Sequence, residues 1–116
     1  MRIYLATIMC IFFIAMPAHA EDDWRAMCNS VASIAETIMK ARQDGVSMAK
    51  MMEIPEPEGS NGLGEGLIIA AYESPRYSTE EMQTRSIEEF RDKAYLQCVK
   101  AIKPKPKARR SKITRE

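Results

Sequence analysis

Apolar residues recur at helical spacing in two long stretches of the chain. Between residues 24 and 43 they fall three and four positions apart, which places them on one face of a helix. Asp22 or Asp23 is a suitable N-terminal cap, and Gly45 follows as a C-terminal stop. Arg42 projects onto the apolar face, where we expect it to bind helix-end carbonyls or an internal carboxylate. The apolar face consists of Trp24, Met27, Cys28, Val31, Ala35, Ile38 and Met39.

A second long helix is predicted from about residue 80 to Ile102. The preceding Ser78-Thr79-Glu80-Glu81 has the form of a capping box, in which the Ser78 hydroxyl accepts a hydrogen bond from the Glu81 amide. Leu96 falls on the side away from the other apolar residues, and a Lys-Pro-Lys-Pro-Lys run from residue 103 ends the helix. The apolar face consists of Ile87, Phe90, Ala94, Cys98, Ala101 and Ile102.

Two shorter helices are expected between the long ones. Residues 48–53 form the first, which Pro55 and Pro57 end. Residues 67–72 are apolar on all sides, and a lone strand would have no partner, so we predict a short buried helix. Residues 55–66 hold four of the five glycines and form a linker. The predicted fold is therefore all-α: a small bundle of two long helices and two short ones.

The first twenty residues have the form of a secretory signal peptide. Arg2 precedes an almost wholly apolar run over residues 3–16, and residues 17–20 end in a small-x-small pattern. A run of about fourteen residues is shorter than the roughly twenty that span a bilayer, although an uncleaved anchor is the alternative. We expect cleavage after Ala20 and export to the periplasm. The predicted organisation is a signal peptide (1–20), a helical domain (21–102) and a basic disordered tail (103–116).

The cysteines predict one disulfide. Cys10 lies in the signal segment, which leaves Cys28 and Cys98, one in each long helix. An even number of cysteines in an exported protein favours a disulfide over a metal site. The two helices should therefore be antiparallel and joined near one end. Closing a loop of about seventy residues is worth roughly 4 kcal/mol in the chain-entropy model.

The net charge of +1 conceals two opposite regions. Residues 21–102 contain nine Lys/Arg and fifteen Asp/Glu, whereas residues 103–116 contain seven Lys/Arg and one Glu. The tail suits an anionic envelope surface, and the alternative is a solubilising tail that folds back on the acidic body. It has no aromatic residues to stack on bases, so nucleic acid is disfavoured. The basic residues are Lys103, Lys105, Lys107, Arg109, Arg110, Lys112 and Arg115.

The residues available for chemistry argue against an enzyme. The only histidine, His19, lies in the signal segment, so the usual general base and the commonest zinc ligand are missing from the mature chain. The disulfide uses both remaining cysteines, and the carboxylates are expected on the surface. We predict no catalytic residues and no cofactor.

Three further groups of residues are candidate sites. Methionine thioethers select copper(I), but without a supporting His or free Cys we favour packing or partner contact for these side chains. The methionines are Met39, Met48, Met51 and Met52. Tyr72, Arg76 and Tyr77 are candidates for partner binding, because interface hot spots are enriched in Tyr and Arg. Packing of the tyrosines at a helix–helix corner is the interpretation that we favour slightly. The Gly62-x-Gly64-x-Gly66 segment lacks the context of a phosphate site, so we interpret it as linker.

Several of these segments together resemble a group of small exported helical proteins of proteobacteria and their prophages. The resemblance rests on the signal peptide, Cys28, Ala71-Tyr72 before a proline and Tyr95-x-x-Cys98, together with the segment Ile38-Met39-Lys40-Ala41-Arg42-Gln43-Asp44-Gly45. It covers most of residues 24–102 and excludes the basic tail. It implies a helical fold and export, and no activity.

The sequence therefore favours a non-enzymatic periplasmic or secreted interaction module. Such a protein would bind another envelope protein, as an inhibitor or as a stress or phage-exclusion factor, and the tail would add affinity for the envelope. The alternatives are a methionine-based copper(I) carrier and an acid-responsive periplasmic chaperone.

Overall fold

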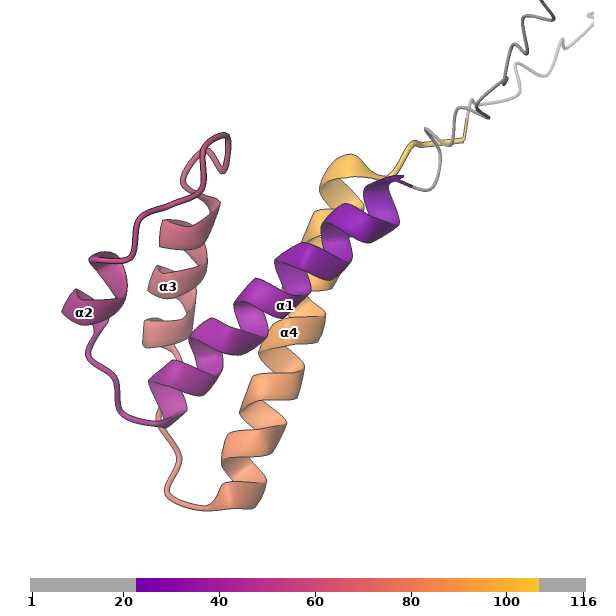
Figure 1. The fold of residues 1–116 in the computed structure, drawn as a ribbon. Helices are drawn as coiled ribbons and strands as arrows, with labels where there is room; N and C mark the ends of the chain where they lie inside the picture. Colours follow the sequence, from indigo (N-terminus) through magenta and orange to yellow (C-terminus); the bar gives the residue numbers. More distant parts are fainter. Residues whose placement is uncertain (1–22, 107–116) are drawn as a thin grey trace, which may run out of the picture.

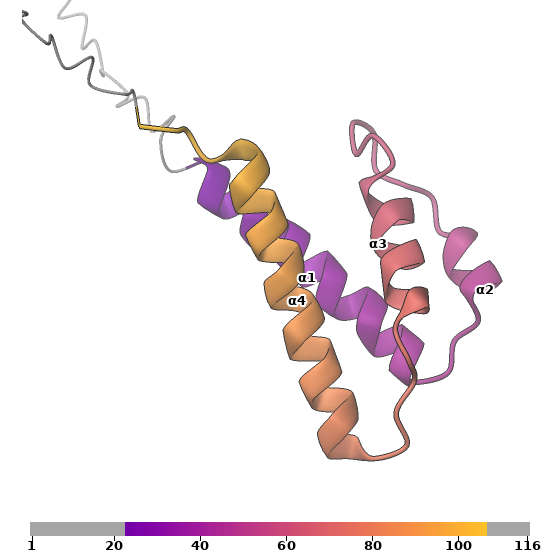
Figure 2. The same cartoon turned by 180° about the vertical axis from the view of Figure 1, so that it is seen from behind.

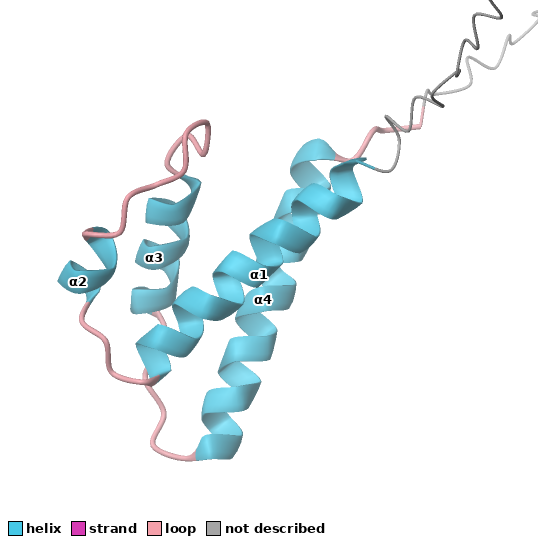
Figure 3. Cartoon of the chain, in the orientation of Figure 1, coloured by secondary structure: helices cyan, strands magenta, loops and turns pink. Residues whose placement is uncertain are grey.

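The computed structural model describes residues 23–106, which form an all-α fold without strands (Figure 1, Figure 3). The predicted fold class, with two long helices and two short ones, is confirmed. The signal segment and most of the basic tail lie outside the described residues. The helices are α1 (Asp23–Gln43), α2 (Met48–Met52), α3 (Leu63–Glu73) and α4 (Glu80–Ile102).

Helices α1 and α4 form an antiparallel hairpin, and they lie side by side in both views (Figure 1, Figure 2). Alanines allow the two backbones to approach closely: Ala35 and Ala94 are buried together with Val31 at the contact. The predicted disulfide joins Cys28 to Cys98 with 5.5 Å between the Cα atoms, a distance typical of disulfides. It lies near the end of the hairpin at which both ends of the described chain emerge (Figure 1).

Helix α3 packs against the C-terminal half of α1, and α2 flanks α3 on the side away from α4 (Figure 2). The core of this region joins all three helices through buried apolar side chains. They are Ile38, Met39, Met51, Ile68 and Ala71. Away from this contact α3 diverges from the hairpin, so the two halves of the molecule are packed to different extents.

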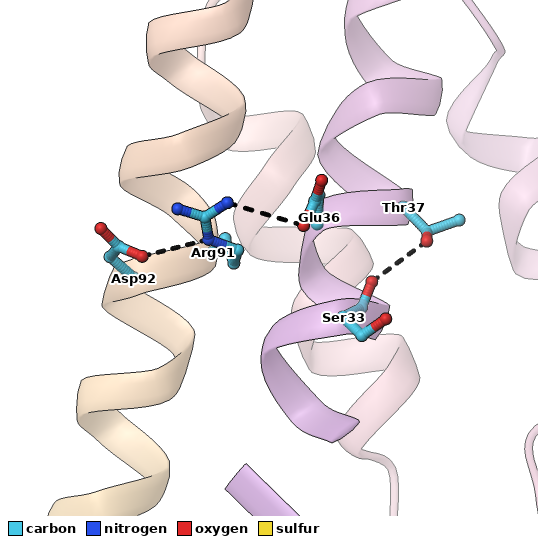
Figure 4. Close-up of polar contacts among 5 residues, drawn as sticks. All are labelled: Ser33, Glu36, Thr37, Arg91 and Asp92. Atoms are coloured by element: carbon cyan, nitrogen blue, oxygen red, sulfur yellow. Dashed lines mark hydrogen bonds and ion pairs between the residues drawn. The ribbon is translucent and has the colours of Figure 1, made fainter. Parts of the chain in front are cut away.

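Polar side chains of α1 and α4 contact one another on the surface of the hairpin (Figure 4). The Arg91 guanidinium of α4 lies 3.8 Å from the Glu36 carboxylate of α1, and its Nε donates to Asp92 Oδ1 at 3.1 Å. The hydrogen bond and the charge of Asp92 raise the pKa of Arg91 above its ordinary value. Thr37 donates to the Ser33 carbonyl one turn back along α1. Exposed ion pairs of this kind contribute little to stability.

Two predicted helix starts are wrong. The N-cap of α4 is Thr79 rather than Ser78: Thr79 has extended φ/ψ, and its hydroxyl accepts from the Met82 amide at 3.3 Å. Helix α3 begins at Leu63 instead of residue 67, because the side chain of Glu56 caps it from the preceding loop. Helix α3 is also not buried on all sides, since Ile69 is 40% exposed.

Most of the predicted apolar face of α1 is buried, whereas that of α4 is only partly covered. Met27 of α1 is 55% exposed and Ile102 of α4 is 38% exposed, although both were predicted to face the core. Ala94 is the only residue of α4 that is fully buried, and Phe90 is half-buried. The physical reason is the divergence of α3, which leaves the disulfide end of the hairpin without a third helix (Figure 2).

Candidate functional site

A groove of about 730 Å³ lies between α3 and the α1–α4 hairpin. All three helices line it with apolar side chains. Leu63, Leu67 and Ala70 recur every three or four residues along α3, so one stripe of this helix faces the groove. The other apolar lining residues include Met27 and Val31 of α1 and Phe90, Ala94, Ala101 and Ile102 of α4. The lining of the groove is therefore mainly apolar.

The groove exists because α3 contacts the hairpin along only part of its length. Leu67 and Phe90 pack against both hydrophobic clusters of the molecule and close the floor between them. Tyr77 and Ser86 line the end of the groove at which α3 meets the hairpin, and we call it the closed end. Helix α3 and the hairpin diverge toward the disulfide end (Figure 2). The lining residues therefore extend along the hairpin from the segment after α3 to the end of α4.

Charged side chains line the rim of the groove. Glu73 of α3 and Glu89 of α4 lie on the half nearer the closed end, and Lys93 follows one turn further along α4. All three are exposed. The rim therefore carries an excess of negative charge above an apolar floor.

Gln43, the last residue of α1, holds the closed end of the groove together. Its side chain is only 1% exposed. Nε2 donates to the Pro75 carbonyl at 3.0 Å and lies 3.5 Å from the Met39 sulfur, while Oε1 accepts from the Tyr77 amide at 2.9 Å. One buried amide thus fixes the segment between α3 and α4 against the end of α1. A buried polar group is tolerated here because its hydrogen bonds are made.

Arg42 and Tyr72 connect the ends of α1 and α3. The Arg42 guanidinium donates from Nε and a terminal nitrogen to the Ser74 carbonyl, both at 3.4 Å, and lies 5.0 Å from the centre of the Tyr72 ring. The Tyr72 hydroxyl donates to the Val46 carbonyl. Ser74 directly follows α3, so Arg42 binds a helix-end carbonyl as expected.

Arg76 binds the C-terminal end of α1. Its Nε donates to the Gln43 carbonyl at 2.9 Å, and its guanidinium lies directly against Gly45. Gln83 of α4 donates to the Tyr77 carbonyl at 2.7 Å, which ties the same segment to the next helix. Of the three predicted partner-binding residues, Tyr72 and Arg76 are therefore used within the molecule. The half-buried Tyr77 lines the groove.

The four methionines considered for copper(I) are divided between core and surface. Met39 and Met51 belong to the buried cluster, whereas Met48 and Met52 are exposed. The Met39 sulfur also accepts a hydrogen bond from Ser86 at 3.7 Å. Packing accounts for the two buried methionines, and copper(I) binding stays a prediction. Within residues 23–106 no group of three or more His, Cys, Asp or Glu side chains is arranged to hold a metal.

The glycine-rich segment before α3 is occupied by a carboxylate of the chain itself. Glu56 accepts hydrogen bonds from the Ser60 hydroxyl at 2.6 Å, the Gly62 amide at 3.1 Å and the Glu65 amide. The bond from Ser60, followed by those from the backbone, lowers the pKa of Glu56 below its ordinary value. A Cβ at Gly64 would lie 3.0 Å from a Glu56 oxygen. The backbone amides that would bind a phosphate here donate their hydrogen bonds to Glu56 instead. This supports the interpretation of the segment as a linker.

The disulfide end carries an aromatic residue between two cations. The half-buried Trp24 has the Arg25 guanidinium 4.4 Å and the Lys103 ammonium 5.7 Å from its ring centre. Of the predicted anionic-surface residues, Lys103 and Lys105 are described and exposed. The remaining ones lie outside the described residues: Lys107, Arg109, Arg110, Lys112 and Arg115.

Two functional features were missed in the sequence. The groove depends on the angle between the axes of α1 and α3, and the pattern of apolar residues does not determine that angle. Gln43 could have been found, because it follows Met39 by four residues and so falls on the apolar face of its helix. A polar residue at such a position predicts a buried hydrogen-bonded group.

In comparisons with known proteins, no family model, curated protein or solved structure matches the chain. No helix in the part of the chain that the structure describes is long and apolar enough to cross a membrane.

Proposed function

We propose that this protein is a non-enzymatic interaction module of the periplasm, exported through the general pathway, that binds a helix of another envelope protein. The single observation that carries the proposal is the open groove between α3 and the hairpin, with its apolar floor and polar rim. An amphipathic helix laid into an apolar groove is a recurring mode of protein recognition. By covering a helix of its partner, the module would act as an inhibitor or as an envelope stress or exclusion factor.

The dimensions and charge of the groove define the partner. The lining residues of α4 extend from Ser86 to Ile102, which corresponds to about 24 Å of helix at about 1.5 Å per residue. A partner helix of about three turns covers the lining from Ser86 to Gln97, about 17 Å, and leaves Ala101 and Ile102 beyond its end. Glu73 and Glu89 outnumber Lys93 on the rim, so the partner helix should carry basic residues beside its apolar stripe.

An affinity capture from periplasm with matched variants tests this function. Ala70 is exposed and lines the groove, whereas its neighbour Ile69 is exposed outside the groove lining. We expect Ala70→Arg to abolish capture of the partner and Ile69→Arg to preserve it. The captured protein should contain a basic amphipathic helix that binds the module as an isolated peptide. Equal capture by both variants, or a second copy of this chain as the captured species, would contradict the proposal.

A second candidate, an acid-responsive chaperone, is favoured by the Glu56 cap. Protonation of Glu56 would weaken the hydrogen bonds from Ser60, Gly62 and Glu65 that hold the start of α3. Loosening α3 would expose more of the apolar groove to unfolded clients. The test is protection of a client protein from aggregation at acid pH. Absence of protection there would exclude this candidate and leave the helix-binding proposal in place.

A further inference from the structure

The disulfide end of the hairpin combines exposed apolar side chains with basic ones. The start of α1 and the end of α4 meet at this end in both views (Figure 1, Figure 2). Met27 is 55% exposed and Ile102 is 38% exposed, and Trp24 lies between the cations of Arg25 and Lys103. We call these five residues, together with Lys105, the basic end. Met27 and Ile102 also line the groove, at the end away from Gln43, where the partner helix proposed above does not extend.

The charge of the molecule is distributed unevenly along α4. The last residues of α4 and the segment after it contribute Lys100, Lys103 and Lys105, whereas the helix starts with Glu80 and Glu81. On α1 the same end has Arg25 beside Asp23, so the described residues of this end are net positive. In the sequence, Glu21 and Asp22 precede this end, and the residues beyond Pro106 add five further basic residues and one Glu. Positive charge is therefore concentrated where the apolar side chains are exposed.

We propose that the basic end docks on a phospholipid bilayer with anionic headgroups. Lysine and arginine attract such a surface, and tryptophan prefers the interface between headgroups and acyl chains. Met27 and Ile102 would enter the outer part of the acyl region beside Trp24. The exposed apolar residues distinguish a bilayer from a soluble polyanion, for which charge alone would suffice. The proposal rests on the envelope location given above, and it directs α3 and the closed end of the groove away from the membrane.

Vesicle binding followed by tryptophan fluorescence tests this proposal. Trp24 is the only tryptophan of the chain, so its emission reports directly on the basic end. The exported protein is used, with its N-terminus checked by mass spectrometry, against vesicles of phosphatidylcholine with and without phosphatidylglycerol. We expect a blue shift and cosedimentation with the anionic vesicles only, and weaker binding as salt is raised. Equal binding to neutral vesicles would overturn the proposal.

Two double variants separate the apolar contribution from the charged one. Met27→Gln with Ile102→Gln should weaken binding at least about tenfold, and Lys103→Gln with Lys105→Gln should weaken it at low salt. Met48→Gln with Met52→Gln is the matched control, because these exposed methionines lie on α2, and it should bind as the wild type does. Unchanged binding by the Met27/Ile102 variant would overturn the proposal in favour of a polyanion bound by the tail. Failure here leaves the capture test with Ala70 and Ile69 unaffected, so the two proposals fail separately.

Discussion

The two ends of α1 are held in opposite ways. At its C-terminal end, Gln43 and Arg42 bind the segment that follows α3, and the polar groups are satisfied within the molecule. At its N-terminal end, the Cys28–Cys98 disulfide joins α1 to α4, and apolar side chains such as Met27 remain exposed. A covalent bond holds two helices together without a third layer of packing. The stapled end can therefore present apolar surface that a packed end would have to bury.

The comparison between the two ends of α1 also separates residues that stabilise the fold from residues that remain available for binding. Tyr72 and Arg76 form hydrogen bonds with the end of α1 and the segment after it, so both serve the fold, and partner binding by them stays a prediction. The half of the molecule toward the disulfide contains the rest of the groove and the basic end. We therefore expect substitutions at the closed end to reduce stability, and substitutions along the groove to reduce binding with little change in stability.

Removal of the disulfide should have the largest effect on stability. We expect Cys28→Ser with Cys98→Ser to lower the free energy of unfolding by about 4 kcal/mol, because the unfolded chain loses a cross-link around a loop of about seventy residues. Denaturant unfolding measures the loss. Hydrogen exchange should show faster opening at the disulfide end than around Gln43. A loss below about 1 kcal/mol would mean that packing already holds this end.

Gln43→Ala should have the next largest effect. The variant leaves the Pro75 carbonyl and the Tyr77 amide without their partner and opens a small cavity, which should cost about 2–3 kcal/mol. Lys40→Ala on an exposed position of the same helix is the control and should be nearly neutral. Thermal unfolding of both variants measures the difference. Equal melting temperatures would contradict the role assigned to Gln43.

Gly45→Ala tests the same end of α1 more mildly. Gly45 has φ +87°, and a Cβ there would lie 2.9 Å from the Arg76 guanidinium. We expect a loss of about 1–2 kcal/mol from the left-handed conformation. Gly66→Ala is the matched control: it lies inside α3 with open space around it, so alanine should be neutral or slightly stabilising. If the unfolding midpoints of both variants move in the same direction, the left-handed conformation of Gly45 is not what makes alanine unfavourable there.

Acid should weaken the start of α3 through Glu56, the smallest of these effects. Because the fold lowers the pKa of Glu56, its stabilisation is complete above the ordinary glutamate pKa and is lost as pH falls through the lowered value. Glu56→Gln should remove this part of the pH dependence, whereas Glu58→Gln, an exposed carboxylate of the same loop, should retain it. The test is the free energy of unfolding of both variants, measured between pH 6 and pH 2. Identical pH profiles for the two variants would contradict the role of Glu56 as the cap of α3.

The sequence predicted features that depend on local spacing. The helical periodicity of residues 24–43 and the two remaining cysteines were enough for the long helices and their disulfide. Features that depend on contacts distant in sequence were not predicted. Glu56 caps α3 from nine residues before Glu65, so the start of that helix was placed too late. Met27 was predicted to be buried because periodicity gives the face of a helix, but not whether another helix covers it.

Site-specific photo-crosslinking in the native envelope tests the helix-binding groove most directly. A photoreactive amino acid is placed at Ala70 or Gln97, which line the groove, and at their neighbours Ile69 or Leu96, which are exposed outside the groove lining. We predict that both groove positions crosslink to the same basic amphipathic helix and that neither neighbour does. Crosslinks of equal yield from the neighbouring positions, or none from the groove, would contradict the proposed function.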